Sequence, residues 1–151
     1  MDNQKLKEKV LSIVPNAEIV EGNQYLVVTV IPGKLFELAK FLKGDPETQF
    51  DYLFCQSGVD FGEKLGVVYH IESTKFRHSI ELKTMVASRE TPQIDSVYNI
   101  WKAAEYHERE IYDLLGIKFR NHPDLRRFFL DDSWGYPLRK DFVDEVNIIE
   151  K

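Results

Sequence analysis

Three β-rich runs follow one another between Phe50 and Ser88, and this succession constrains the fold more than any other feature of the chain. The runs are FDYLFCQSGVDF, EKLGVVYHIEST and HSIELKTMVAS. In the third run, apolar Ile80 and Leu82 alternate with charged Glu81, which is the pattern of a strand with one buried face. The chain is therefore predicted to build a β-sheet around this segment.

Helical and further β patterns surround the three runs. They lie at 3–14 (helix), 17–31 (hairpin with a Gly22-Asn23 turn), 34–44 (helix) and 95–115 (a longer helix ended by Gly116). The resulting order is αββαβββα. This order predicts a single α+β domain whose helices pack on a mostly antiparallel sheet.

The composition limits the class of protein. With 151 residues, 43% of them hydrophobic, the chain is long enough to build one compact core. Its longest apolar run, Tyr25 to Ile31, is far shorter than the roughly 20 residues that span a bilayer. No apolar segment follows the N-terminal lysines. We therefore expect neither a membrane span nor a secretory signal.

The single cysteine, Cys55, also excludes some chemistry. It cannot form an intrachain disulfide, which is consistent with a reducing compartment. One thiolate cannot hold an iron–sulfur cluster, because such a cluster takes about four. We expect Cys55 to be an inert core residue of its strand, since buried thiols behave as small apolar groups.

Residues 118–151 have a different character from the rest of the chain. Four arginines lie between Arg120 and Arg139, interleaved with aromatic residues, and periodicity fades after Gly116. Arginine and aromatic side chains are enriched at protein interfaces. We therefore expect a globular α+β docking domain over 1–117 and an irregular, extended partner-binding tail over 118–151. The formal net charge of −5 disfavours nucleic-acid binding.

The predicted last helix carries a carboxylate on its apolar side. At about 100° per residue, Glu108 lies on the stripe formed by Val97, Trp101, Ala104, Ile111 and Leu115. A buried carboxylate has to be paired or protonated. We predict an arginine of the tail or of a partner as its counterion, and a general acid or base with a raised pKa is the alternative. Glu105, Arg109 and Asp113 follow at i, i+4 and i+8 on another flank, where we expect a solvent-exposed ladder.

The pair His107-Glu108 matches the start of a zinc-binding HExxH helix. The second histidine of that motif is replaced by Ile111, which removes a ligand. Gly58, Gly62 and Gly66 are spaced around a hairpin-like turn, not in a phosphate-binding loop. No Walker or nucleophile-elbow sequence occurs. We therefore predict no catalytic, cofactor-binding or metal-binding residue on this chain.

Three motif blocks lie between Ile100 and Phe142. The first holds Glu108, Arg109, Glu110, Asp113 and Gly116; the second runs His122, Pro123, Asp124, Leu125, Arg126 and Arg127; the third is Pro137, Leu138, Arg139, Lys140 and Asp141. In this order and at these separations, the blocks resemble the 30 kDa subunit family, also called the C subunit, of the proton-translocating NADH:quinone oxidoreductase (respiratory complex I). The resemblance makes these residues the expected partner interface.

The resemblance implies a structural subunit of the peripheral arm, without a redox centre of its own. Flavin and iron–sulfur clusters are then expected on partner subunits, and catalysis belongs to the assembly, which transfers electrons from NADH to quinone and translocates protons. The implied partner is the quinone-pocket subunit, which is related to the hydrogenase large subunit. The implied location is peripheral, on the cytoplasmic face of the inner (plasma) membrane.

Two alternatives to this function stay open from the sequence. The same scaffold role occurs in related ferredoxin- or hydrogenase-linked membrane complexes. The more remote alternative is a stand-alone acid/base enzyme that uses Glu108 and His107, which requires a pocket around these two side chains.

Overall fold

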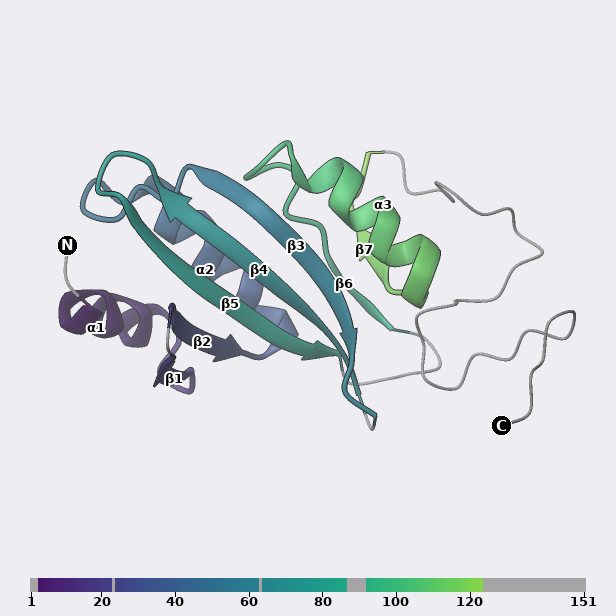
Figure 1. The fold of residues 1–151 in the computed structure, drawn as a ribbon, viewed down its shortest axis with the longest axis horizontal. Coiled ribbons are helices and arrows are strands. Elements are labelled where there is room, and N and C mark those ends of the chain that lie inside the picture. The colour runs from purple at the N-terminus through teal and green to yellow at the C-terminus, as the bar shows by residue number, and fades with distance from the viewer. Residues whose placement is uncertain (1–2, 23, 63, 87–91, 124–151) are drawn as a thin grey trace, which may run out of the picture.

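The structure is a computed structural model that describes residues 3–22, 24–62, 64–86 and 92–123 (Figure 1). Its elements are α1 (Asn3–Ile13), β1 (Glu18–Glu21), β2 (Leu26–Val30), α2 (Pro32–Gly44), β3 (Tyr52–Asp60), β4 (Leu65–Ser73), β5 (His78–Val86), β6 (Gln93–Asp95), α3 (Ala104–Leu115) and β7 (Lys118–Arg120). The predicted α+β fold is confirmed, and the short strands β6 and β7 are additions to the predicted order.

Five strands form the main sheet in the order β1-β2-β5-β4-β3. Three of the four neighbouring pairs are antiparallel, as predicted, and only β2 and β5 run parallel. The parallel pair arises because α2 and the β3-β4 hairpin carry the chain across the sheet before β5 returns beside β2. Strands β6 and β7 form a separate parallel pair.

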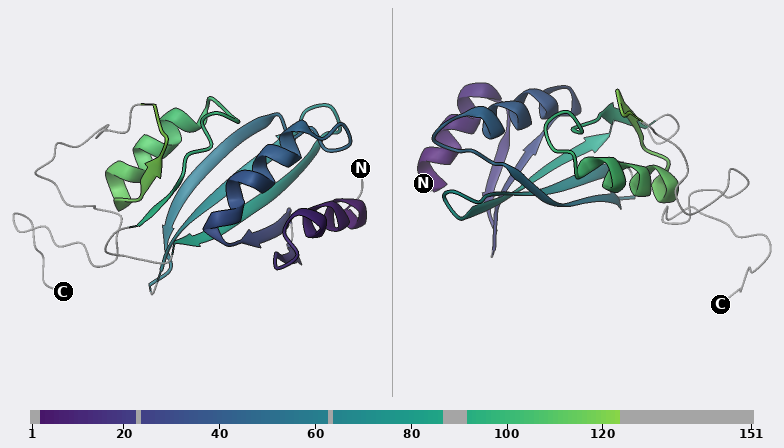
Figure 2. Two further views of the ribbon diagram at one scale, coloured as in Figure 1. Left: turned by 180° about the vertical axis from the view of Figure 1, so that it is seen from behind. Right: turned by 90° about the horizontal axis from the view of Figure 1, so that it is seen from above.

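Helices α1 and α2 lie on one face of the sheet (Figure 2). The apolar stripe of α2 is buried against it, with Leu38 and Leu42 fully inaccessible to solvent. From the sheet side, alternate residues of β5 complete the core, including Ile80 and Leu82. The alternation in the third β-rich run therefore has the predicted role.

The helix predicted from Asp95 to Leu115 is interrupted in the structure, so this prediction was wrong in its first half. Asp95 ends β6, which pairs with β7, and the helix itself begins at Ala104. Between them the backbone makes turns, in which Ser96 Oγ accepts from Tyr98 N at 3.1 Å. The pairing with β7 comes from a segment over 20 residues further along the chain, which local periodicity does not reveal. Gly116 ends the helix as predicted, with φ 79°.

Strand β3 contains an irregularity that redirects its side chains. Its register against β4 shifts between Leu53 and Cys55. A bulge of one residue moves all later side chains to the opposite face. Leu53 and Gln56 are therefore buried, whereas Cys55 is half-exposed on the other face, with Sγ 3.4 Å from Ser57 Oγ. The prediction of Cys55 as a core residue was wrong for this reason.

No helix within the described ranges is long and apolar enough to cross a membrane. The expected tail begins with β7, whose Phe119 is buried in the core. The described part of the chain ends at Pro123, so the last four residues of the second motif block and all of the third block lie outside it.

Candidate functional site

The carboxylate of Glu108 is the most unusual group in the described structure. It lies on the inner side of α3 and is fully buried, as its position on the apolar stripe predicted. Trp101, Ile111 and Leu115 of the same stripe are also buried. The apolar spacing therefore places this acidic group in the interior.

Three hydrogen-bond donors surround the carboxylate. The side-chain amide of Gln56 donates to Oε2 at 3.1 Å, and the Val97 backbone N–H donates to the same oxygen at 3.0 Å. The hydroxyl of Ser96 donates to Oε1 in a very short contact. These donors come from β3 and from the turn after β6, so Glu108 joins α3 to two other parts of the fold.

Neither Gln56 nor Ser96 was predicted as a partner of Glu108. Gln56 faces α3 only because of the bulge that precedes it in β3. Ser96 was expected to start a helix, and its hydroxyl instead binds a side chain twelve residues later. The sequence does contain one signal for the Ser96 contact, because Ser96 directly precedes Val97, the first residue of the apolar stripe on which Glu108 lies.

Burial raises the pKa of Glu108 to about 7, although the bonds from Ser96, Val97 and Gln56 each favour the charged form. The carboxyl is therefore near its titration midpoint at neutral pH. Tyr69 lies opposite Gln56 in β4, and burial together with the charge on Glu108 raises the pKa of its phenol well above the usual range. Both effects follow from the low polarity of this part of the core.

Within the described ranges, the partners recorded for Glu108 are uncharged. The predicted arginine counterion stays a prediction, because Arg126, Arg127, Arg139 and Lys140 lie outside the described residues. A cation that approached this buried carboxylate would stabilise its charged form strongly, because the attraction between opposite charges is large where polarity is low.

The predicted solvent-exposed ladder was wrong for two of its three members. Arg109 is 8% exposed and Asp113 is fully buried, whereas Glu105 is partly exposed. The buried arc of α3 is wider than its apolar stripe, because the helix contacts both β3 and β7. The first motif block thus contributes three buried charged residues, and its remaining charged member, Glu110, is exposed.

A close contact fixes α3 on β3. A Cβ atom at Gly58 would overlap Leu115 Cδ1 and lie 2.8 Å from Ile111 Cγ2. A larger residue at this position would force Leu115 and Ile111 to move. Gly62, by contrast, lies in the β3-β4 turn at φ 95°, as its spacing suggested.

The second motif block starts beside the other end of α3. His122 Nε2 lies 3.0 Å from the carbonyl oxygen of Glu105, and its ring is 6.4 Å from that of Tyr98. Pro123 is exposed. The start of this block therefore contacts both α3 and the turn that carries Ser96.

The geometry around Glu108 does not favour acid/base catalysis. A hollow of about 210 Å³ lies between β3 and α3, and its lining includes Gln56, Glu110 and Ile111 but neither Glu108 nor His107. A substrate in this hollow would not contact the buried carboxylate. Among the described residues, no group of three or more His, Cys, Asp and Glu side chains could hold a metal ion.

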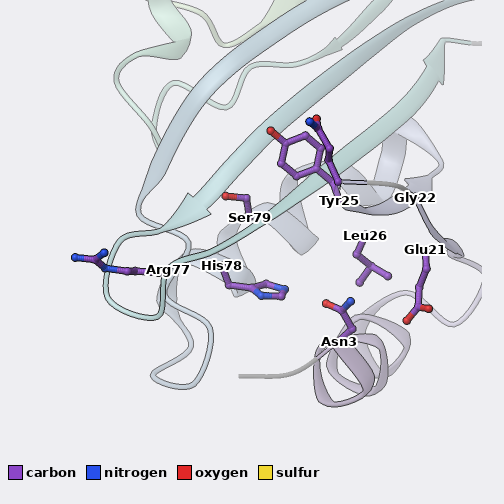
Figure 3. Close-up of a pocket in the computed structure, with 9 residues that line it drawn as sticks. Asn3, Glu21, Gly22, Tyr25, Leu26, Arg77, His78 and Ser79 are labelled. Carbon is purple, nitrogen blue, oxygen red and sulfur yellow. The ribbon is translucent and has the colours of Figure 1, made fainter.

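A second hollow of about 460 Å³ lies at the far end of the sheet, between the start of α1 and the β4-β5 turn (Figure 3). Its lining is mostly polar and includes Glu21, Arg77 and Ser79. The buried atoms Asn3 Oδ1 and His78 Nε2 have no hydrogen-bond partner among the described residues. Burial lowers the pKa of His78, so the ring is neutral at pH 7 and suits a neutral polar partner such as water.

Several proteins of known identity are similar to this chain. It is 49% identical over 113 residues to the C/D subunit of the NADH-quinone oxidoreductase of Phocaeicola vulgatus. The matched region is 74% of this chain and 21% of that protein. It is 48% identical over 113 residues to the C subunit of the same enzyme in Chloroherpeton thalassium, covering 72% of this chain and 47% of that protein. The chain thus spans half or less of the length of these two relatives.

A longer match is to the NADH-quinone oxidoreductase C subunit of Roseiflexus castenholzii, with 36% identity over 148 residues, 93% of this chain and 84% of that protein. The fold is shared with a chain in the structure of the membrane-bound sulfane sulfur reductase (MBS), an archaeal respiratory membrane complex. The TM-score is 0.79 with 24% identity, over 95% of this chain and 86% of the other.

Residues 28–146 match the family model of the respiratory-chain NADH dehydrogenase, 30 Kd subunit. The match contains Glu108, its three hydrogen-bond donors and all three motif blocks. The chain therefore belongs to the 30 kDa subunit family of the respiratory-chain NADH dehydrogenase.

Proposed function

We propose that this chain is a cofactor-free structural subunit of the peripheral arm of an NADH:quinone oxidoreductase. In this role it docks on the quinone-pocket subunit and supports electron transfer from NADH to quinone, coupled to proton translocation. Flavin and iron–sulfur clusters are carried by other subunits. The complex holds the chain on the cytoplasmic face of the plasma membrane.

The observation that carries the proposal is the match to a relative whose name joins a C part and a D part in one protein, of which this chain covers 21%. We propose that the D part corresponds to the quinone-pocket subunit on which this chain docks. The single cysteine supports a cofactor-free role, because an iron–sulfur cluster takes about four thiolates.

The geometry of the first motif block supports a structural role. Its buried charged residues, Glu108, Arg109 and Asp113, lie within the fold. Glu108 does not line the adjacent hollow. We propose that the residues after Pro123 bind along the partner, with Arg126 and Arg139 as charged anchors. A tail rich in arginine and aromatic residues has the composition of an interface centre.

The test is purification of the complex through a tag on this chain. We expect a quinone-pocket subunit to co-purify in equal amount, and the isolated chain to show no flavin or iron–sulfur absorbance. Truncating one side of a desolvated charge pair costs about 2–5 kcal/mol, so Arg126→Ala or Arg139→Ala should reduce assembled complex on a native gel. Lys102→Ala, which removes an exposed cation from the turn before α3, is the control.

A stoichiometric cofactor on the isolated chain would contradict the proposal, as would normal assembly of both arginine variants. The same role in a ferredoxin- or hydrogenase-linked complex is the second candidate, because the fold also occurs in the archaeal sulfane sulfur reductase complex. Genes for NADH-binding flavin subunits beside this gene would favour the first candidate.

A further inference from the structure

Among the described helices, none covers one of the two faces of the main sheet. Figure 1 looks onto this open face, and Figure 2 shows α2 lying across the opposite one. In β4 and β5 the helix-side residues alternate with residues that point to the open face, such as His70, Glu81 and Lys83. The bulge in β3 adds Cys55 to the same face, opposite His70.

The open face carries an aromatic cluster among its polar residues. A sheet with one covered face normally carries polar residues on the other. Here a compact aromatic cluster occupies it, and the cluster consists of Tyr25, Tyr52, Phe54 and His70. Tyr52 is 48% exposed, and Phe61 at the end of the same hairpin is 40% exposed. The other three members of the cluster are partly exposed, and a contiguous aromatic group at a protein surface is a candidate interaction site.

The rings of the aromatic cluster are held in a fixed arrangement. Phe54 stacks on His70 at 5.7 Å between centroids, and Tyr25 lies 5.2 Å from His70 on a tilted plane. His70 Nε2 in turn lies 2.9 Å from Glu81 Oε1. A hollow of about 500 Å³ is lined by Tyr25, Val27, His70 and Glu81 together with the Gly22 turn.

The chemistry of this hollow suits a guanidinium group. Aromatic faces attract a planar cation, and a carboxylate beside them accepts hydrogen bonds from it. Glu81 supplies the carboxylate, and Glu72 lies on the same face two residues from His70. Lys83, a cation of this face, lies 5.7 Å from the ring of Phe61, away from the hollow. The cluster therefore combines ring faces with carboxylates.

We propose that the aromatic cluster and Glu81 form a docking surface for an arginine-bearing segment of a neighbouring subunit. The proposal rests on the proposed function, because it needs a multi-subunit assembly. This docking surface would be a second contact with the assembly, in addition to the proposed contact through the tail. It lies on the face of the sheet opposite α1 and α2. The arginine lies in the hollow against Tyr25, beside the stacked rings of Phe54 and His70, and pairs with Glu81.

The test is photo-cross-linking within the purified complex. Benzoylphenylalanine replaces Phe54 in one variant and Leu11 in the control, where Leu11 is 41% exposed on α1 in the helix layer. We expect position 54 to cross-link to another subunit, at a peptide that contains or adjoins an arginine, in higher yield than position 11. Intact complex on a native gel verifies assembly in both variants.

Charge and ring chemistry are tested by Phe54→Leu combined with Glu81→Gln. The fraction of this chain retained on the complex in raised salt should fall roughly threefold to tenfold, the size expected for a desolvated cation–π contact with its carboxylate. Glu37→Gln, on the exposed side of α2, should leave retention unchanged. Equal unfolding midpoints of the isolated variants show that loss of retention is not loss of folding.

Several results would overturn the proposal. These are equal cross-linking at positions 54 and 11 in an assembled complex, cross-links only to a second copy of this chain, and cross-links only to its own residues 124–151. Each leaves the proposed function standing, since the complex has assembled. Failure to assemble even in the wild type would instead reject the proposed function, and with it the docking surface that depends on it.

Discussion

The side-chain amide of Gln56 donates a hydrogen bond of 3.1 Å to Glu108, and this bond connects β3 to α3 through the core. The carboxylate at its end is fully buried among neutral donors. Its protonation therefore couples the stability of the fold to pH near neutrality. Glu108 belongs to the first motif block, so this bond connects a charged residue of that block to β3.

The first prediction concerns the pH dependence of folding. The pKa of Glu108 is about 7 in the folded chain and 4.5 in an ordinary setting. Between these values the folded state binds more protons, so stability is full below about pH 4.5, falls as the pH rises toward 7 and levels off above it. The loss is on the order of 3 kcal/mol. Glu108→Gln, whose amide can still donate to Ser96 Oγ, should remove this part of the slope.

Urea unfolding at pH 5 and pH 8 measures the effect. The matched control is Glu110→Gln, which changes an exposed neighbour on the same helix and should keep the wild-type slope. An unchanged slope in Glu108→Gln would contradict the prediction, because it would show that Glu108 does not contribute to the pH dependence of stability between pH 5 and pH 8.

The second prediction concerns the contact of α3 with β3. Gly58→Ala forces a methyl group against Leu115 and Ile111, and overpacking of this kind costs about 1–3 kcal/mol. Gly33→Ala, in α2 with no atom within 4 Å of the new methyl group, should be neutral or slightly stabilising. Thermal unfolding of the two variants gives the comparison, and equal midpoints would mean that α3 can shift without cost.

The third prediction concerns the half-exposed cysteine. Cys55 should react with a thiol reagent in the folded chain, because its side chain lies on the open sheet face. The labelling rate should be the same in Gly58→Ala as in the wild type. A rate that increases in the destabilised variant in proportion to its unfolding constant would place Cys55 in the core instead.

The fourth prediction concerns a buried hydrogen bond between distant segments. Trp101 Nε1 donates to the carbonyl oxygen of Phe50 at 2.9 Å. Trp101→Phe removes the donor and leaves the buried carbonyl without this bond, at a cost of about 1–3 kcal/mol. Tyr52→Phe, on an exposed ring, should change the free energy of unfolding by less than about 0.5 kcal/mol. Comparable losses in both variants would refute the role of the Trp101 bond.

Much of the fold could be predicted because it depends on local periodicity. Alternation in 78–88 predicted β5, and helical spacing in 34–44 predicted α2. The spacing around Glu108 also predicted a buried carboxylate, since burial of an apolar stripe takes every residue on that line with it. Gly116 marked the end of α3, because glycine tolerates the left-handed conformation found there.

The sequence by itself thus determined which elements form and that Glu108 is buried, because both follow from the side on which neighbouring residues are apolar. Only the tertiary structure decided what meets the carboxylate. One bulge in β3 turned Gln56 inward and Cys55 outward, and the pairing of β6 with β7 replaced a predicted helix with the turn that carries Ser96. Such contacts join segments from 12 to 52 residues apart, and they depend on strand register, which no local pattern encodes.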